Sequence, residues 1–362
     1  MGKVEVNMKT IDTSFWKDKR VFLTGHTGFK GSWLSLWLQS IGADVHGFAL
    51  SPPTQPALFS EANVGVDMTS SFGDIGDFKH LMDVMGKYQP DIIFHGAAQP
   101  LVRFSYKYPI ETYVTNVLGT VHVLEAARQV GTAKAIVNIT TDKCYEIQDK
   151  KLGYCEEDTL GGHDPYSSSK ACSELISSTY RESYFENSGI SLATARAGNV
   201  IGGGDWAVDR LVPDILRSFE KGQSVLVRNP HAIRPWQHVL EPLSGYIMLA
   251  EKLFSDKNFA EGWNFGPNDE DARSVQWIVE YMVASWKQGV GWKSDEGVHP
   301  HEANVLKLNI TKSRNRLGWS PRWSLPTALD KIIDWHDAWL KKANIRETCL
   351  EQINDYMSSS NR

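Results

Sequence analysis

The chain has 362 residues, of which 41% are hydrophobic and 22% charged, a balance typical of a globular protein rather than a disordered one. Its 38 Lys and Arg against 43 Asp and Glu give a formal net charge of −5, which argues against nucleic-acid or membrane-surface partners. No apolar run approaches the roughly 20 residues that cross a bilayer, and the charged first 20 residues lack the apolar stretch of a secretory signal. The four cysteines show neither a CxxC pair nor metal-ligand spacing. We therefore expect a cytoplasmic protein with reduced thiols and no metal site.

The first two hundred residues alternate short apolar strands with amphipathic helices. Strands separated by helices are typical of parallel crossovers, and they predict an α/β fold with a Rossmann-type doubly wound parallel sheet, covered on both faces. The expected strands are residues 21–24, 44–50, 91–95, 135–140 and 190–196, and the expected helices are residues 32–41, 78–88, 109–130 and 166–187.

A glycine-rich turn, TGHTGFKG at residues 24–31, follows the first strand and opens the first long helix. Glycines three apart let the backbone turn tightly and approach a pyrophosphate, which the free N–H groups and dipole of the helix N-terminus attract. A purely structural turn is the alternative, but the position directly after the first strand favours dinucleotide binding. The candidate cofactor-binding residues here are Gly25, His26, Thr27, Gly28, Phe29, Lys30 and Gly31.

The end of the second strand bears on which dinucleotide binds. An acidic residue usually holds the adenosine ribose there, but this chain has Ala49-Leu50-Ser51 followed by two prolines, so Ser51 is the candidate. No Lys or Arg lies between Ser51 and Phe78 to meet a 2′-phosphate. The sequence therefore favours NAD over NADP.

The segment YSSSK at residues 166–170 predicts a catalytic pair. A spacing of four places Tyr166 and Lys170 on one helical face. A phenol with its ordinary pKa near ~10 is a poor base at neutral pH, and a neighbouring ammonium is expected to lower that pKa. Tyr166 would then accept a sugar hydroxyl proton while hydride leaves the same carbon. A surface Tyr–Lys pair is the alternative, which the preceding glycine turn and βαβ units argue against.

After Gly198 the regular alternation ends. Residues 202–206 (GGGDW) and 234–236 (RPW) are typical of irregular segments that close over a substrate. We therefore expect a NAD-binding Rossmann domain over residues 15–198, with a returning segment at about 230–266. A smaller, irregular C-terminal substrate-binding lobe is expected over residues 199–229 and 267–350.

Eight segments together resemble one known family. They are residues 24–31, 95–100, 116–120, 140–146, 166–170, 196–206, 233–239 and 263–267. On these segments the chain resembles the extended short-chain dehydrogenase/reductase family, and within it the nucleotide-sugar 4,6-dehydratases, from residue 21 to about residue 339. At residues 140–143 (TTDK) and 234–239 (RPWQHV) the chain most resembles the members of this group that act on CDP-glucose, and this resemblance implies CDP-glucose as the substrate.

The resemblance implies NAD-dependent oxidation at carbon 4, loss of water across carbons 5 and 6, and return of hydride to carbon 6. The product would be CDP-4-dehydro-6-deoxyglucose, a precursor of deoxysugars in surface polysaccharides such as the O-antigen of lipopolysaccharide. Thr141 would join Tyr166 and Lys170 at the reacting hydroxyl, and Asp142 would protonate the departing 6-hydroxyl. Lys143 departs from the acidic residue commoner there, and it can act as the carbon 5 base only when neutral; steadying an enolate or acting through water are the alternatives.

The resemblance also implies further contacts. Those to the cofactor are Asp74, Ile75, Ala97, Ala98, Gln99, Asn116, Thr140, Tyr166, Lys170 and Ala197. Those to the substrate are Gln99, Thr141, Asn199, Arg210, Leu211, Val212, Arg228, Arg234 and His301. Asp74 has the alternative role of capping the following helix, and each arginine that of an ordinary surface cation. The family habit is a homodimer through the helices at 109–130 and 166–187, with a homotetramer as the alternative.

Two other functions remain open at this point. A nucleotide-sugar 4-epimerase, or a dehydratase for another nucleotide, shares the glycine turn and the Tyr–Lys pair, but an epimerase needs no acid beside Thr141. A non-catalytic NAD-binding scaffold has no use for a positioned phenolate, so Thr141, Tyr166 and Lys170 argue against it.

Overall fold

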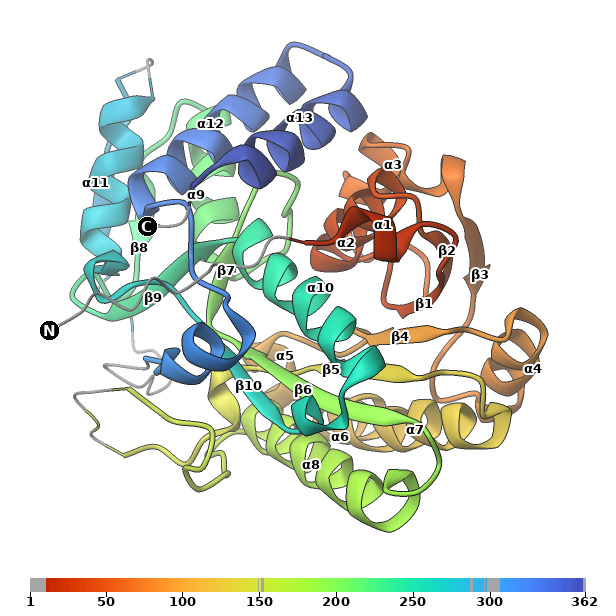
Figure 1. The fold of residues 1–362 in the computed structure, drawn as a ribbon. Coiled ribbons are helices and arrows are strands. Elements are labelled where there is room, and N and C mark those ends of the chain that lie inside the picture. Colours follow the sequence, from red (N-terminus) through yellow and green to blue (C-terminus); the bar gives the residue numbers. More distant parts are fainter. Residues whose placement is uncertain are drawn as a thin grey trace, which may run out of the picture.

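The computed structural model describes residues 11–148, 150, 153–286, 289–295, 297 and 307–360. His301, a predicted substrate contact, lies outside these residues. A seven-stranded sheet forms the centre, with the strand order β10-β6-β5-β4-β1-β2-β3 and every neighbouring pair parallel (Figure 1). Its strands are β1 (Arg20–Thr24), β2 (Asp44–Ala49), β3 (Thr69–Phe72), β4 (Ile92–His95), β5 (Ala135–Ile139), β6 (Ser191–Ala197) and β10 (Gly262–Phe265).

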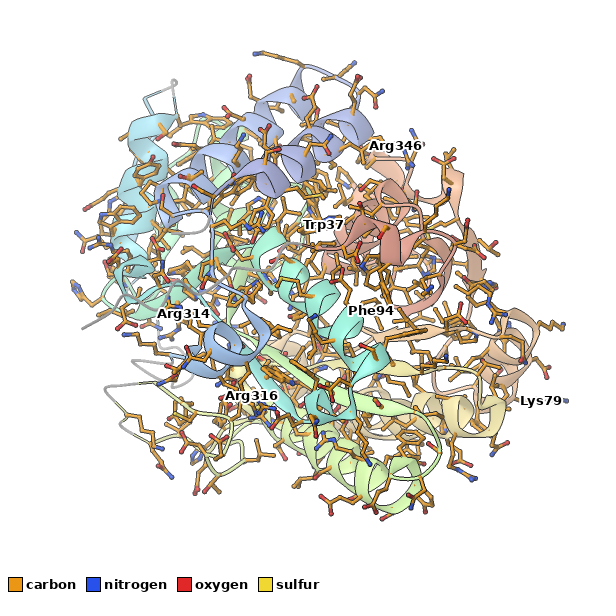
Figure 2. All side chains as sticks on the ribbon, viewed as in Figure 1. Trp37, Lys79, Phe94, Arg314, Arg316 and Arg346 are labelled. Carbon is orange, nitrogen blue, oxygen red and sulfur yellow. The ribbon has the colours of Figure 1, made fainter. Side chains whose placement is uncertain are left out.

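Helices cover both faces of this sheet, as the sequence predicts. Alternate strand residues supply the two cores: Val21 and Phe94 face one cluster, whereas Phe22 and Ile136 face the other. α2 (Phe29–Ser40) and α10 (Leu240–Ser255) pack on the first face, and α4 (Phe78–Tyr88), α7 (Gly119–Val130) and α8 (Pro165–Tyr180) pack on the second (Figure 1). Figure 2 shows Trp37 and Phe94 inside the first core, where both are fully buried.

The predicted strands and helices are confirmed with small differences at their ends. The long helix predicted over 109–130 is α6 (Pro109–Tyr113), a π-helical turn (Val114–Leu118) and α7 in succession. The helix predicted over 166–187 is α8 followed by a second π turn (Arg181–Phe185). Strand β3 was not predicted from the sequence. Its residues TSSF are mostly polar, and none of them is buried at this edge of the sheet. 

Two smaller sheets and further helices complete the described part of the chain. A three-stranded sheet has the order β11-β9-β7, and a two-stranded sheet pairs β12 with β8. These strands are β7 (Asn199–Ile201), β8 (Val225–Val227), β9 (Ile233–His238), β11 (Ala272–Ser274) and β12 (Trp292–Ser294). The helices are α1 (Thr13–Trp16), α3 (Leu58–Glu61), α5 (Val102–Lys107), α9 (Leu211–Glu220), α11 (Val275–Ser285), α12 (Leu325–Leu340) and α13 (Ile345–Ser358). Across the part of the chain that the structure describes, none of the helices is long and apolar enough to cross a membrane.

Candidate active site

The glycine turn joins β1 to α2, and two of its three glycines are required by packing within the protein. Gly25 has a φ of +81°, and a Cβ there would lie 2.8 Å from the backbone nitrogen of Ala97. A Cβ on Gly31 would lie 2.1 Å from the carbonyl oxygen of Gly25. A Cβ on Gly28, by contrast, would meet only that same oxygen, at an ordinary 3.5 Å. The protein itself leaves room at Gly28, where the N-terminus of α2 begins, and this fits the approach of a pyrophosphate.

The side chains of the turn point partly into the protein. Thr27 Oγ1 donates to the carbonyl oxygen of Leu50 at 2.9 Å and so ties the turn to the end of β2. The His26 ring is fully buried, packs against Gly47, and its Nε2 lies 3.2 Å from Ser70 Oγ. Burial lowers the pKa of His26 to about 4, so the ring is neutral at pH 7.

Lys30 is the side chain of the turn that the structure brings to the catalytic residues. Burial lowers its pKa to about 7, and the positive charges of Arg210, Lys170 and Lys143 act in the same direction. Asp142 opposes them. The turn and the catalytic segment therefore share one electrostatic environment, which the sequence reasoning did not predict for this amine.

Tyr166 and Lys170 stand in the first two turns of α8. Asp164 caps this helix by accepting from the backbone nitrogen of Ser167 at 2.9 Å, and Pro165 occupies the first helical position. Tyr166 is 8% exposed and Lys170 is 7% exposed, and Lys170 Nζ donates to the carbonyl oxygen of Ile139 at 3.2 Å. The Tyr–Lys pair is thus a buried pair rather than a surface one.

Burial changes the electrostatics expected for this pair. It raises the pKa of Tyr166 to about 12, and the opposing effects of the Thr141 hydrogen bond and of Arg210 do not compensate. It lowers the pKa of Lys170 to about 8, against the effect of Glu174. The predicted lowering of the Tyr166 pKa is therefore wrong for the protein alone. The loss of water around the phenol outweighs both the positive charge of Arg210 and the Thr141 hydrogen bond.

The segment after β5 carries the predicted acid. Thr141 caps the short 3₁₀ turn Asp142–Cys144 and its Oγ1 donates to Asp142 Oδ1 at 2.9 Å. Asp142 is 1% exposed, and its other oxygen, Oδ2, is buried without a hydrogen-bond partner and faces Gly198 and Pro235. Lys143 Nζ lies 3.7 Å from Asp142 Oδ1. A buried carboxyl oxygen without a hydrogen-bond partner is costly, and a substrate hydroxyl would supply that partner.

Gln99 and Asn116, two further predicted cofactor residues, hydrogen-bond to each other. The backbone nitrogen of Gln99 donates to Asn116 Oδ1 at 2.8 Å, and Asn116 Nδ2 donates to the Gln99 carbonyl oxygen at 3.0 Å. Asn116 Nδ2 also donates to Ser169 Oγ on α8 at 2.9 Å. This amide therefore fixes the loop after β4 against the catalytic helix. Ala97 and Ala98 lie in the same loop, and Ala197 ends β6.

The other predicted cofactor residues are spread along the sheet edge. Ser51 and Asp74 are exposed after β2 and β3, and Asp74 Oδ1 accepts from the backbone nitrogen of Gly76 at 2.8 Å. The cap of α4 is Asp77, not Asp74. Ile75 is buried and its carbonyl oxygen lies 2.8 Å from His122 Nδ1. Thr140 is buried, and its Oγ1 donates to Glu174 Oε1 at 2.5 Å.

Among the predicted substrate arginines, Arg210 is one whose charge acts on the catalytic residues. It precedes α9, its Nη1 donates to Asp205 Oδ2 at 2.8 Å, and its charge acts on both Tyr166 and Lys30. Arg228 pairs with Asp209 at 3.3 Å, farther along the same face. Asn199 opens β7 and Arg234 lies on β9. Leu211 and Val212 begin α9, and Val212 belongs to the core of this region.

Sequence reasoning missed the charged pair Glu174 and Arg196. Glu174 lies one turn beyond Lys170, and Arg196 Nη2 on β6 lies 2.8 Å from Glu174 Oε2. Their spacing of 22 residues crosses a helix end and a loop, so no local pattern marks them as partners. The four-residue spacing of Tyr166, Lys170 and Glu174 was the one available signal.

Taken together, the geometry places the Tyr166 phenol, the Asp142 carboxyl group and three amines, those of Lys30, Lys143 and Lys170, in one site at the carboxyl end of the sheet, next to a helix N-terminus suited to an anion. This is the crevice where open α/β sheets bind their ligands. Proton transfer to and from a bound sugar next to a dinucleotide is the chemistry such a set can perform.

The chain is similar to several known proteins along most of its length. The chain is 55% identical to CDP-glucose 4,6-dehydratase from Salmonella typhimurium over 358 residues, which cover 97% of this chain and 100% of that protein. Among solved structures it is similar to an epimerase from Methanothermobacter thermautotrophicus (TM-score 0.78, 22% identity, covering 92% of this chain and 96% of that one). It is also similar to dTDP-glucose 4,6-dehydratase from Bacillus anthracis in complex with NAD (TM-score 0.74, 22% identity, covering 91% and 99%). The two structures show the fold.

Family membership follows from a match over most of the chain. Residues 22–332 match the family of GDP-mannose 4,6 dehydratase. The fold, the glycine turn and the Tyr–Lys helix agree with that match. The chain therefore belongs to the GDP-mannose 4,6 dehydratase family, within the extended short-chain dehydrogenases/reductases.

Proposed function

We propose that the chain is a NAD-dependent hydro-lyase that converts CDP-glucose to CDP-4-dehydro-6-deoxyglucose. The 55% identity to the Salmonella CDP-glucose 4,6-dehydratase over almost the whole chain supports the substrate. The observation that carries the reaction is the buried Asp142, whose Oδ2 lacks a partner while its Oδ1 is bound by Thr141 beside Tyr166. A 4-epimerase has no need of this acid.

Each residue has a role in this reaction. Bound NAD supplies a nicotinamide that accepts hydride from carbon 4 and returns it to carbon 6. Tyr166 takes the proton of the carbon 4 hydroxyl, and Lys170 stabilises the resulting phenolate. The ketone at carbon 4 makes the carbon 5 proton acidic, and Asp142 protonates the departing 6-hydroxyl. Lys143, beside Asp142, takes the carbon 5 proton directly or through water, and it returns a proton to carbon 5 by the same route when hydride reaches carbon 6.

The cofactor fits the residues present. The room at Gly28 and the start of α2 hold the pyrophosphate, and Ser51 and Asp74 line the adenosine end. No Lys or Arg between residues 51 and 78 offers a cation to a 2′-phosphate, which supports NAD.

The nucleotide sugar is held by the C-terminal lobe, residues 199–229 and 267–350. Arginine forks suit diphosphate oxygens, and Arg210 and Arg228 in this lobe and Arg234 in the returning segment offer three. Asn199 contacts the sugar-linked diphosphate, and Gln99, from the loop after β4, adds a further substrate contact. His301 completes the predicted set. The returning segment at 230–266 contributes β10 to the central sheet and so joins the lobe to the NAD-binding domain, residues 15–198.

The enzyme assembles as a homodimer through α6, the π turn after it and α8. Ile110 is 79% exposed, and Leu118 and Leu175 are 45% and 56% exposed, which is unusual for apolar side chains on neighbouring helices. A second copy of this chain, related by a twofold axis, would bury them. Light scattering should give twice the chain mass, and Ile110→Glu/Leu175→Glu should give the monomer; a monomeric unmodified protein would contradict the dimer.

One assay tests the function. The purified protein is incubated with NAD and, in turn, CDP-, UDP-, GDP- and dTDP-glucose and GDP-mannose, and the products are identified by NMR. A 4-keto-6-deoxy sugar from CDP-glucose is the expected result. A 4-epimer would show the epimerase instead, and no turnover of any sugar by NAD-loaded protein would favour the scaffold.

A further inference from the structure

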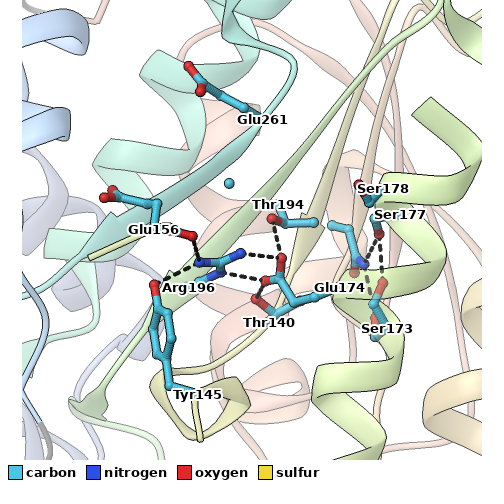
Figure 3. Close-up of polar contacts among 12 residues, drawn as sticks. Thr140, Tyr145, Glu156, Ser173, Glu174, Ser177, Ser178, Thr194, Arg196 and Glu261 are labelled. Atoms are coloured by element: carbon cyan, nitrogen blue, oxygen red, sulfur yellow. Dashed lines mark hydrogen bonds and ion pairs between the residues drawn. The ribbon is translucent and has the colours of Figure 1, made fainter. Parts of the chain in front are cut away.

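The catalytic helix carries a third buried charge behind Tyr166 and Lys170. Glu174 is 3% exposed and both of its carboxylate oxygens are fully used (Figure 3). Oε1 accepts from Thr140 Oγ1 at 2.5 Å and from Arg196 Nε at 2.9 Å. Oε2 accepts from Thr194 Oγ1 at 2.6 Å and from Arg196 Nη2 at 2.8 Å. Because four donors occupy the carboxylate, Glu174 has no capacity left for substrate.

Arg196 extends this contact along the same face of the sheet toward β10. Its Nη1 donates to the hydroxyl of Tyr145 at 2.7 Å and to the carbonyl oxygen of Glu156 at 3.0 Å. The Tyr145 hydroxyl in turn donates to Asn264 Oδ1 at 2.7 Å. Figure 3 shows the Arg196 guanidinium between Glu174 on one side and Tyr145 and Glu156 on the other. The pair therefore joins α8, the end of β5, β6 and β10 in one buried layer beneath the site.

The pair keeps a negative charge one helical turn from Lys170. Burial works against ionisation of Glu174, but Arg196, Thr140 and Thr194 outweigh it and lower the pKa of Glu174. The pKa of Arg196 is raised well above its ordinary value, because the Glu174 carboxylate outweighs the effect of burial. Both groups are therefore charged at neutral pH, as a bidentate, desolvated ion pair.

Among the groups that raise the pKa of Lys170, Glu174 has the largest effect. The ionisable groups that act on it or respond to it come from four elements: Glu174 on its own helix, Cys144 in the 3₁₀ turn, His95 on β4 and Lys30 on α2. Burial raises the pKa of the Cys144 thiol and lowers that of His95 to about 3, so both are neutral at pH 7. Glu174 is the anion of this set.

We propose that Glu174 is a positioning residue for the reaction: with Arg196 as its counter-charge, it holds Lys170 as an ammonium next to Tyr166 without touching the substrate. Lys170 must stay protonated to stabilise the phenolate, and burial alone opposes this. This inference rests on the proposed function for its catalytic consequence, but not for the protonation of Lys170.

The test removes both charges together, in Glu174→Gln/Arg196→Met, so that no buried charge is left unpaired. The alkaline limb of the kcat/KM profile should move down by about one pH unit, and activity at pH 8 should fall about fivefold, with the KM for CDP-glucose unchanged. Arg196→Lys, which keeps a cation for Glu174, should retain the limb. Glu182→Gln, the same Glu to Gln change in the π turn that extends α8, is the matched control and should leave the profile as it is.

A second readout needs no turnover. NMR titration of lysine labelled with ¹³C at Cε, with the Lys170 signal assigned from Lys170→Arg, should show the same downward shift for Lys170 in the double variant. An unmoved Lys170 titration, or an equal shift in Arg196→Lys, would overturn the proposal. If the unmodified protein failed to convert CDP-glucose, the proposed function would fail while this titration would still decide the role of Glu174.

Discussion

Two buried carboxylates flank the Tyr166–Lys170 pair, and they differ in how many hydrogen bonds the surrounding region supplies to them. In the layer beneath the site, Glu174 accepts four hydrogen bonds, two of them from one guanidinium. At the site itself, Asp142 accepts one from Thr141, and its Oδ2 accepts none. Both side chains are almost completely buried. A buried polar oxygen without a partner costs free energy. The protein therefore keeps Asp142, whose Oδ2 is unpaired, where a ligand completes its hydrogen bonding. It keeps Glu174, whose oxygens are saturated, where the carboxylate fixes the structure.

The largest expected effect comes from the residue between these two regions. Tyr166→Phe removes the phenolic oxygen that accepts the carbon 4 proton, so kcat should fall about 1,000-fold, or about 4 kcal/mol. NADH formation in a single turnover and product formation should be lost together. Tyr180→Phe, on the same helix and partly buried, is the control and should retain activity. A Tyr166→Phe enzyme that still reduced NAD at a normal rate would contradict the assignment.

A third buried carboxylate, also fully hydrogen-bonded, sharpens the comparison, because its partners include no bidentate cation. Glu241 accepts from the backbone nitrogens of Arg322 and Trp323 and from the hydroxyl of Tyr356. Burial raises its pKa to about 7, whereas the pKa of Glu174 is lowered. Hydrogen bonds without a bound guanidinium therefore do not keep a buried carboxylate ionised here.

This difference predicts a pH dependence of stability. Because the folded protein raises the pKa of Glu241, the contribution of this group is fully present below the unfolded pKa and is lost as pH rises through about 7. The free energy of unfolding of the unmodified protein, relative to Glu241→Gln, should fall by up to about 3 kcal/mol between about pH 4 and pH 8. Urea unfolding of both proteins across this range measures it. Parallel curves would show that Glu241 does not titrate there.

The unsatisfied carboxylate predicts a separation of the reaction steps. Asp142→Asn should still allow hydride to reach NAD, but without the acid the 6-hydroxyl leaves slowly, so overall turnover should fall about 100-fold, or about 2.7 kcal/mol. NADH and a 4-keto-6-hydroxy sugar should accumulate. Normal turnover by Asp142→Asn would show that another group is the acid.

The sequence predicts the strand–helix alternation well because each buried strand is a short apolar run and each helix has a clear beginning. It does not predict β3, whose polar residues lie at the sheet edge. It also does not predict the Glu174–Arg196 pair, because their contact depends on the packing of α8 over β6. The prediction for the pKa of Tyr166 is wrong for a similar reason. The spacing to Lys170 is visible in the sequence, but the loss of water around the phenol is a property of the fold.

The same contrast between filled and open positions holds in the glycine turn, where it gives the smallest expected effect. Gly31→Ala should destabilise the fold, because its Cβ would lie 2.1 Å from the carbonyl oxygen of Gly25. Gly28→Ala should fold normally, because its Cβ would meet that oxygen at 3.5 Å. A methyl group at Gly28 would, however, stand where the pyrophosphate approaches, so NAD affinity should fall about tenfold, or about 1.4 kcal/mol. Calorimetric titration with NAD and thermal unfolding of both variants separate the two effects. If Gly28→Ala bound NAD as tightly as the unmodified protein, the room at this position would not be the pyrophosphate site.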